Sequence, residues 1–138
     1  MNAKMCWAAM MMVLACCAVE PLSAQEPKLR ATLADNGWVV SSVAFSPNGK
    51  LLASSNWDKV VKLWDAETSK ETAILKGNAK LFAVAFSPNS RMVASGSIDN
   101  TITIWEVPIG KETATLRGHT KSVSCVAFNP GPYQARKR

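Results

Sequence analysis

The residue types that carry catalysis and metal binding are scarce in this sequence of 138 residues. It contains one histidine, His119, and four cysteines, three of which lie within residues 1–24. Beyond them only Cys125 remains, so no cluster of His and Cys side chains has the spacing of a zinc site. A Gly-rich phosphate loop and a Gly-x-Ser-x-Gly elbow are also missing. We therefore expect no catalytic, cofactor-binding or metal-binding residues, and no enzymatic activity.

The N-terminus has the layout of a secretory signal peptide over residues 1–24. Lys4 supplies a short basic start, residues 5–19 are apolar and uncharged, and small residues lead up to Ala24. The apolar run is shorter than the roughly 18–20 residues of a membrane-spanning helix, so we expect cleavage after Ala24 and no stable membrane span afterwards. The protein would be secreted or periplasmic. An uncleaved anchor and an ordinary N-terminal helix are alternatives. Residues 13–16 (Val-Leu-Ala-Cys) also loosely match a lipid-attachment box, which leaves anchoring at Cys16 open.

Net charge and cysteine content narrow the partners and disulfides that are possible for the chain after residue 24. The formal net charge is +6, and three of those charges lie in the C-terminal residues 136–138. This modest balance does not favour a nucleic-acid partner. With a single cysteine left, no internal disulfide can form, and the apolar run around Cys125 predicts a buried thiol.

The chain is organised around a phrase that occurs twice. Residues 43–65 and 84–106 align without a gap at a spacing of 41 residues, and ten of the 23 positions are identical. A third copy begins at residues 126–130 (Val-Ala-Phe-Asn-Pro) and then stops. A fixed period of this length indicates a repeat architecture.

Each period contains four short strands. An alternating segment such as 71–75 is followed by a β-branched run, and proline in Ser-Pro-Asn ends that run because it cannot donate to a strand ladder. Two further apolar strands follow, joined by a short turn at Asp58 or Asp99. Four strands in a meander form an antiparallel sheet, and sheets of this size bury their apolar faces by stacking. We therefore expect an all-β fold of four-stranded β-propeller blades, although a sandwich or barrel is an alternative.

The repeated phrases resemble WD repeats. The resemblance rests on Leu-Arg-Gly-His at 116–119, the Val-Ala-Phe-Ser-Pro-Asn phrases, Ala-Ser before a turn Asp, and Leu-Trp-Asp at 63–65, and it covers roughly residues 28–130. It implies an incomplete propeller behind the signal peptide. It implies a linker and leading outer strand over 25–37, a WD-repeat region over 38–130 and a basic irregular tail at 131–138. Within the WD-repeat region, the implied blades are 38–75 and 80–116, followed by a partial third blade at 120–130.

The resemblance also implies structural roles for the repeated polar residues. In the family, a His, a Ser or Thr, the turn Asp and the Trp form a network that ties loops to strands. Here Asn36 and Asn78 occupy the His position in the first two copies, so only His119 keeps it. No copy therefore has all four members. The remaining positions are Ser54, Asp58, Trp64, Ser95, Asp99 and Trp105.

The family resemblance implies a platform for protein–protein contact on the face that carries the turn Asp residues. Trp57 is the most informative candidate, because a large apolar ring in a turn finds little core. An alternative interpretation is that Trp38 and Trp57 only cover one another. The predicted partner contacts are Trp38, Trp57, Phe82, Ile98 and Lys121.

Length is the remaining problem, because two blades and a partial third cannot close a ring that typically has 4–8 blades. An open array exposes apolar faces and unpaired edges. We therefore expect a truncated piece of a larger propeller, including a remnant without independent function, or a module that closes its ring with copies of itself or another chain. A marginal open fragment is a third possibility. The irregular residues 131–138, which do not resemble a capping repeat, favour truncation.

Overall fold

The computed structural model describes residues 28–34 and 38–131. The predicted signal peptide, residues 25–27 and nearly all of the basic tail lie outside the described residues. The chain divides into two units, Met1–Thr32 and Leu33–Arg138, and every strand belongs to the second. Within the described residues, no helix is long and apolar enough to span a membrane.

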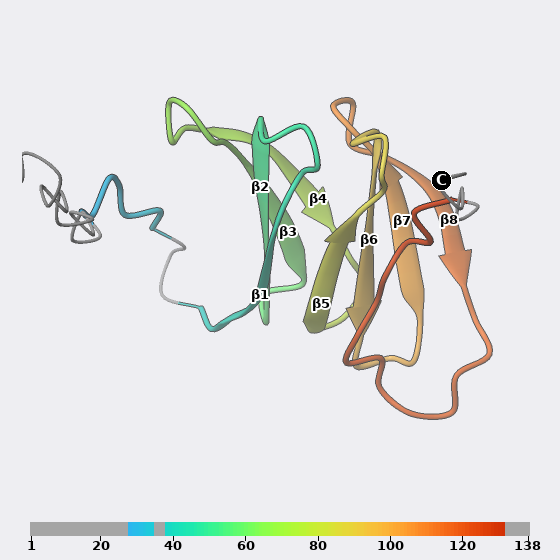
Figure 1. The fold of residues 1–138 in the computed structure, drawn as a ribbon. Helices are drawn as coiled ribbons and strands as arrows, with labels where there is room; N and C mark the ends of the chain where they lie inside the picture. Colours follow the sequence, from blue (N-terminus) through green and yellow to red (C-terminus); the bar gives the residue numbers. More distant parts are fainter. Residues whose placement is uncertain (1–27, 35–37, 132–138) are drawn as a thin grey trace, which may run out of the picture. The chain divides into compact units, whose positions relative to one another are not determined.

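Eight strands form two separate four-stranded sheets (Figure 1). Within each sheet the strands are antiparallel and follow one another in chain order, so the all-β meander expected from the sequence is confirmed. The sheets cover residues 40–76 and 81–116, compared with the predicted blades at 38–75 and 80–116. The strands are β1 (Val40–Phe45), β2 (Leu51–Asn56), β3 (Val60–Asp65), β4 (Glu71–Lys76), β5 (Leu81–Phe86), β6 (Met92–Ser97), β7 (Ile102–Glu106) and β8 (Lys111–Leu116).

The Ser-Pro-Asn phrase builds the same turn in both sheets. In the first sheet, the Ser46 hydroxyl donates to Asn48 Oδ1 at 2.7 Å and accepts the Leu51 amide at 2.9 Å. The second sheet repeats both bonds, at 2.7 and 2.9 Å, with Ser87, Asn89 and Met92. Short polar side chains that bond to nearby backbone groups favour turns, which explains why these residue types recur.

The backbone repeats with the same period as the sequence. Six turn positions have positive φ, and they form three pairs separated by 41 residues. In two of the pairs one member is glycine, the residue that adopts this conformation at least cost. The pairs are Gly49 and Ser90, Lys59 and Asn100, and Ser69 and Gly110.

The core lies between the two sheets. The first sheet contributes the face that carries Ala53, Val61 and Leu63, and the second contributes the face that carries Val93 and Trp105. Strand β5 packs against β1 and β2, which brings the inner strands of the two sheets side by side. Stacked sheets of this kind bury the apolar face that neither could bury alone.

The first sheet leaves its other face open. Val43 and Phe45 in β1 are 60% and 67% exposed, whereas their counterparts Val84 and Phe86 in β5 are 7% and 8% exposed. The residue types are identical, so the difference comes from packing: the second sheet has the first beside it. No sheet among the described residues covers the face of β1 that carries Phe45.

Two strands implied by the resemblance are not formed. Residues 28–33, the proposed outer strand, carry no strand, because no described strand is paired with them. Residues 120–130, the proposed start of a third blade, also form no strand, although Val123 is buried and its amide donates to Ser97 O at 3.0 Å. Cys125 is exposed, so the prediction of a buried thiol is wrong: its run lies outside both sheets.

Candidate functional site

The turns that carry the two Asp residues gather at one end of the sheets, the lower end in Figure 1. We call this the Asp-turn end and define it as residues 56–59, 76–80, 98–100 and 117–121. Backbone hydrogen bonds tie its turns together: the Gly77 amide donates to Lys59 O at 2.7 Å, and the Ile98 amide donates to Lys80 O at 2.9 Å. These bonds hold the side chains of this end on an ordered backbone.

An aromatic and cationic cluster lies at this end. The rings of Trp57 and Phe82 meet edge to face, with centroids 6.5 Å apart and planes at 89°. The Lys80 ammonium lies 5.1 Å from the centroid of the Trp57 ring, a cation–π distance. Trp57 remains 38% exposed, and its amide donates to Val39 O at 3.1 Å. We call Trp57, Phe82 and Lys80 the Trp57 cluster.

The structure brings together only some of the predicted partner contacts. Trp57 and Phe82 touch, while Trp38, Ile98 and Lys121 are exposed and make no ring contact with Trp57 in the described part of the chain. In the described part of the chain the ring that packs against Trp57 is Phe82, whereas the alternative interpretation expected Trp38. Sequence reasoning missed Lys80, although it directly precedes an inner strand.

In the first sheet, part of the implied structural network is assembled. The indole Nε1 of the buried Trp64 donates to Ser54 Oγ at 3.0 Å. Asp58 is exposed and does not close the turn. Instead, Asn56 Oδ1 accepts the amides of Asp58 and Val60 at 3.0 and 3.2 Å. The side chain two residues before the predicted Asp therefore orders this turn.

The second sheet assembles a different part. Asp99 Oδ1 accepts the Thr101 hydroxyl at 2.6 Å and the Thr101 amide at 3.1 Å, and the hydroxyl hydrogen bond is the main cause that lowers the pKa of Asp99. Ser95 Oγ is buried without a hydrogen-bond partner among the described residues, so Ser95 does not accept from Trp105. His119 is exposed in the segment after β8 and is not joined to this turn.

Comparison with protein families matches most of the chain. Residues 27–65, 69–106 and 110–133 match the WD domain, G-beta repeat family, WD40. The chain belongs to the WD40 repeat family. The resemblance inferred from the repeated phrases is therefore confirmed, and the two sheets are WD40 blades.

Similar WD40 proteins are much longer than this chain. Small ribosomal subunit protein RACK1z of Arabidopsis thaliana is 46% identical over 56 residues, which cover 41% of this chain and 17% of RACK1z. The general transcriptional corepressor TUP1 of Saccharomyces cerevisiae is 44% identical over 39 residues, covering 28% of this chain and 6% of TUP1. The chain thus spans less than a fifth of these relatives.

Solved WD40 structures share the fold. The structure of U3-55K superposes with a TM-score of 0.64 at 18% identity and covers 67% of this chain and 30% of that chain. The crystal structure of the RRP9 WD40 repeats gives a TM-score of 0.63 at the same identity and coverage. At this identity the likeness establishes the arrangement of strands and nothing about a ligand.

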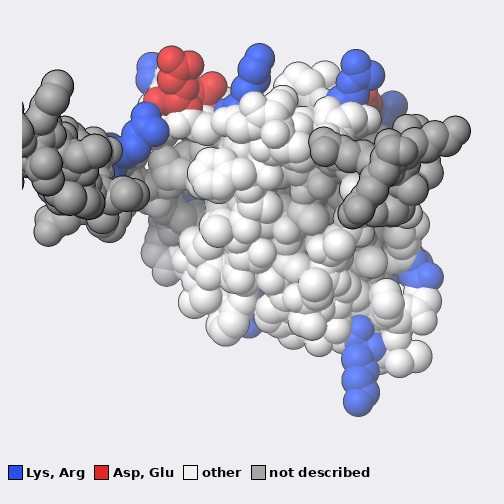
Figure 2. Space-filling view, in the orientation of Figure 1, with Lys and Arg blue, Asp and Glu red and all other residues white. Residues whose placement is uncertain are grey.

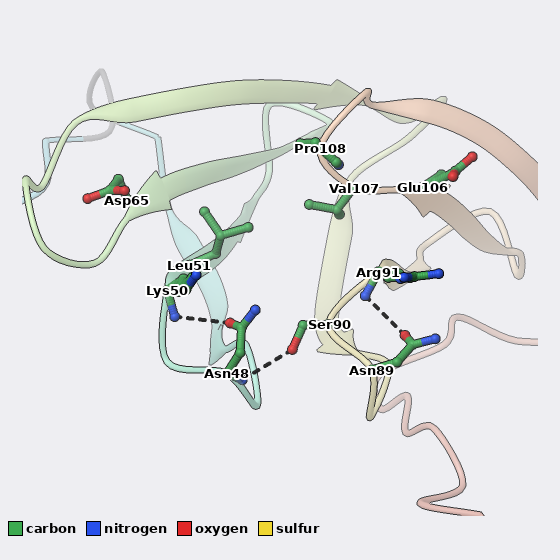
Figure 3. Close-up of a pocket in the computed structure, with 10 residues that line it drawn as sticks. All are labelled: Asn48, Lys50, Leu51, Asp65, Asn89, Ser90, Arg91, Glu106, Val107 and Pro108. Atoms are coloured by element: carbon green, nitrogen blue, oxygen red, sulfur yellow. Dashed lines mark hydrogen bonds between the residues drawn. The ribbon is translucent and has the colours of Figure 1, made fainter.

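A second surface feature lies at the opposite end of the WD40 blades, in a groove of about 610 Å³ between the two Ser-Pro-Asn turns (Figure 3). Its amide side chains already serve the turns: Asn48 Oδ1 accepts from Lys50 N, and Asn89 Oδ1 accepts from Arg91 N. Asp65 likewise accepts the amide and hydroxyl of Thr68, and the amide bond is the main cause that lowers its pKa. These amide and carboxylate groups are occupied by their own loops, and the charged side chains of Lys50, Arg91 and Glu106 also line the groove.

The described part of the chain offers no site for metal chemistry. No group of three His, Cys, Asp or Glu side chains lies close enough together there to hold a metal ion. The Trp57 cluster is therefore the candidate functional site, because it combines exposed aromatic surface with an ordered backbone.

Proposed function

We propose that this WD40 chain is a non-enzymatic protein-interaction module that presents its Asp-turn end to a protein partner. The observation that carries the proposal is the edge-to-face pair of the exposed Trp57 and the half-buried Phe82, next to turns fixed by backbone hydrogen bonds. Aromatic side chains on an ordered surface supply much of the binding energy of protein interfaces, since they bury a large area at a small entropic cost.

The names of two relatives agree with a role in assemblies. RACK1z is a ribosomal subunit protein and TUP1 a corepressor of transcription. Both names describe action together with other macromolecules, which supports an interaction role for a chain built from the same repeats.

Replacement of Trp57 by Ala tests the proposal. Because Trp57 is partly exposed in a turn, we expect Trp57→Ala to weaken capture of proteins from an extract while the far-UV circular dichroism of the strands stays unchanged. Ile109→Ala is the matched control, since Ile109 is an exposed apolar residue at the opposite end. Loss of the β-signal in Trp57→Ala would instead assign the ring a packing role, and equal capture by both variants would contradict the proposal.

The open face of the first blade favours self-association as a second candidate function. Within the chain, the Phe86 face of the second blade packs on the Leu75 face of the first. The counterparts of these residues, Phe45 and Leu116, are exposed. A second copy could therefore join its Phe45 face to the Leu116 face of the first copy, head to tail, in place of residues 119–131. If further copies repeated this contact, the oligomer would close the propeller ring.

Two blocked variants separate this assembly from general aggregation. Phe45→Lys and Leu116→Lys should each reduce the mass measured by light scattering, because each removes one half of the contact. Mixed together, they retain one intact Phe45 face and one intact Leu116 face, so we expect a one-to-one heterodimer. Self-association that persists in both variants, or a mixture that stays monomeric, would contradict head-to-tail assembly.

We also propose export through residues 1–24, supported by their basic start, apolar run and small residues before Gln25. The mass of the protein recovered outside the cytoplasm should correspond to a chain that begins at Gln25. A chain recovered with Met1 intact from the cytoplasm would contradict export, and a lipid-modified Cys16 would show the lipoprotein alternative.

A further inference from the structure

Charge is distributed unevenly between the two ends of the blades. In the described residues, the Asp-turn end carries five basic side chains against two carboxylates, whereas the corresponding residues of the opposite end (46–51, 65–71, 87–92 and 106–111) carry four basic side chains against four carboxylates. Figure 2 shows this on one face: acidic residues appear only at the upper end, and the lower end shows only basic ones. The basic side chains of the Asp-turn end are Lys59, Lys76, Lys80, Arg117 and Lys121.

The positive charge at the Asp-turn end is only partly balanced, through the interaction of Arg117 with the charge of Asp99. None of its five basic side chains forms an ion pair with a carboxylate of residues 28–34 or 38–131. Of the two acids, Asp99 is engaged with both the hydroxyl and the amide of Thr101. The Lys80 ammonium lies over the Trp57 ring, so one cation is placed directly beside the exposed apolar surface.

We propose that the Asp-turn end binds an acidic protein segment: a linear peptide in which carboxylates flank an apolar side chain. The apolar side chain would contact Trp57 and Phe82, and the carboxylates would lie near Lys59 and Lys80. This inference rests on the proposed function and adds the chemistry of the partner. Opposite charge accelerates encounter and selects between partners, while the buried apolar contact supplies affinity.

The same surface is less suited to nucleic acid. Single-stranded nucleic acids bind to open aromatic faces on which bases stack. Here Lys80 lies over the Trp57 ring, and Phe82 meets Trp57 edge to face. A peptide carboxylate needs no stacking face, so the acidic segment fits the geometry better.

Fluorescence anisotropy with the full chain tests the chemistry of the partner. The probe is a labelled short peptide in which Asp and Glu flank a Leu-Phe pair. Two control peptides replace either the acids with Lys or the Leu-Phe pair with Ala, and a labelled oligouridylate of the same length represents nucleic acid. We expect only the acidic apolar peptide to bind well, with an affinity that falls as salt increases. Tighter binding of the oligouridylate, or equal binding of all peptides, would overturn the proposal.

Charge reversal then locates the contact. Lys59→Glu and Lys80→Glu should each weaken binding of the acidic peptide by about tenfold, whereas Lys70→Glu, an exposed residue at the opposite end, should leave it unchanged. Equal losses in all three variants would overturn the assignment to this end.

Trp57→Ala distinguishes the two proposals. If the lysine peptide binds and Trp57→Ala abolishes this binding, the Asp-turn end is the interaction surface but its partner is not acidic. Binding of the acidic peptide that is unaffected by both Trp57→Ala and the charge reversals at the Asp-turn end would reject the surface itself. Circular dichroism of each variant checks that the blades remain folded.

Discussion

At the scale of the residue, equivalent side chains in the two blades differ in their hydrogen bonds. The Trp64 indole uses Ser54 as its acceptor, whereas the corresponding Ser95 hydroxyl is buried without a partner among the described residues. Leaving a buried donor unpaired costs about 1–3 kcal/mol, but removal of an unpaired hydroxyl costs little. The same serine of the repeat therefore contributes differently to stability in the two blades.

This difference predicts unequal effects of one substitution. Ser54→Ala should lower the free energy of unfolding by about 1–3 kcal/mol, since the Trp64 N–H loses its acceptor inside the sheet. Ser95→Ala should be close to neutral or stabilising. Urea denaturation of the two variants beside the parent measures both effects, and equal losses of stability would contradict the assignment.

The lowered pKa of Asp99 gives a second prediction at this scale. The carboxylate is favoured in the folded state by its bond to the Thr101 hydroxyl, so its pKa lies below the ordinary value of 3.8. This stabilisation is present above the pKa of the unfolded chain and is lost as the pH falls through the folded value. The urea midpoint should therefore fall on acidification below about pH 4, and it should fall less steeply in Thr101→Val. An unchanged slope in that variant would show that other carboxylates control the acid sensitivity.

At the scale of the element, residues 119–131 depend on a close contact with β6. A Cβ placed on Gly96 would lie 2.5 Å from Val123 O and 2.7 Å from Val123 Cγ1, both closer than real Cβ atoms approach. The corresponding residue of the first blade is Ser55, which is fully buried in β2, the strand on which β5 rather than this segment packs. Glycine at this position therefore allows the segment to lie on the second blade.

Gly96→Ser should displace the segment without unfolding the blades. The Val123 amide, which donates to Ser97 O, should then exchange its hydrogen at least about tenfold faster. Amides in β2 and β3 serve as the internal reference, because the first blade is remote from the substitution. Unchanged protection at Val123 would show that the segment is held by other contacts.

The elements also show which parts of the structure the sequence could predict. The turns at Ser46 and Ser87 follow from local residue types, because the Ser and Asn side chains bond to backbone groups only a few residues away. Pairing is not local. Residues 126–128 repeat the Val-Ala-Phe phrase of β1 and β5, yet they form no strand, because no described strand pairs with them. Cys125 is exposed for the same reason.

Only part of the candidate site could be predicted from the sequence. An apolar ring in a turn identified Trp57 from sequence alone, since turns offer little core. Lys80 was missed because its position over the ring depends on how the β4–β5 connection meets the β2–β3 turn. Asn56 was missed because the Asp two residues later is the conventional turn residue, and local sequence does not show which of the two accepts the amides.

At the scale of the whole molecule, the second blade is buried where the first is open. Phe45 and Phe86 occupy the same place in the repeat and differ only in whether another blade covers them. Removal of a buried Phe side chain costs about 3–5 kcal/mol, whereas an exposed ring contributes little to stability. Stability is thus concentrated at the interface between the blades.

Phe45→Ala and Phe86→Ala test this directly. Phe86→Ala should lower the free energy of unfolding by about 3–5 kcal/mol, because it opens a cavity between β5 and the first blade. Phe45→Ala should change stability by less than about 1 kcal/mol at low protein concentration. A loss for Phe45→Ala that grows with protein concentration would show that a second copy covers this face, because association then stabilises the folded chain. Equal, concentration-independent losses would contradict the packing assigned to the two blades.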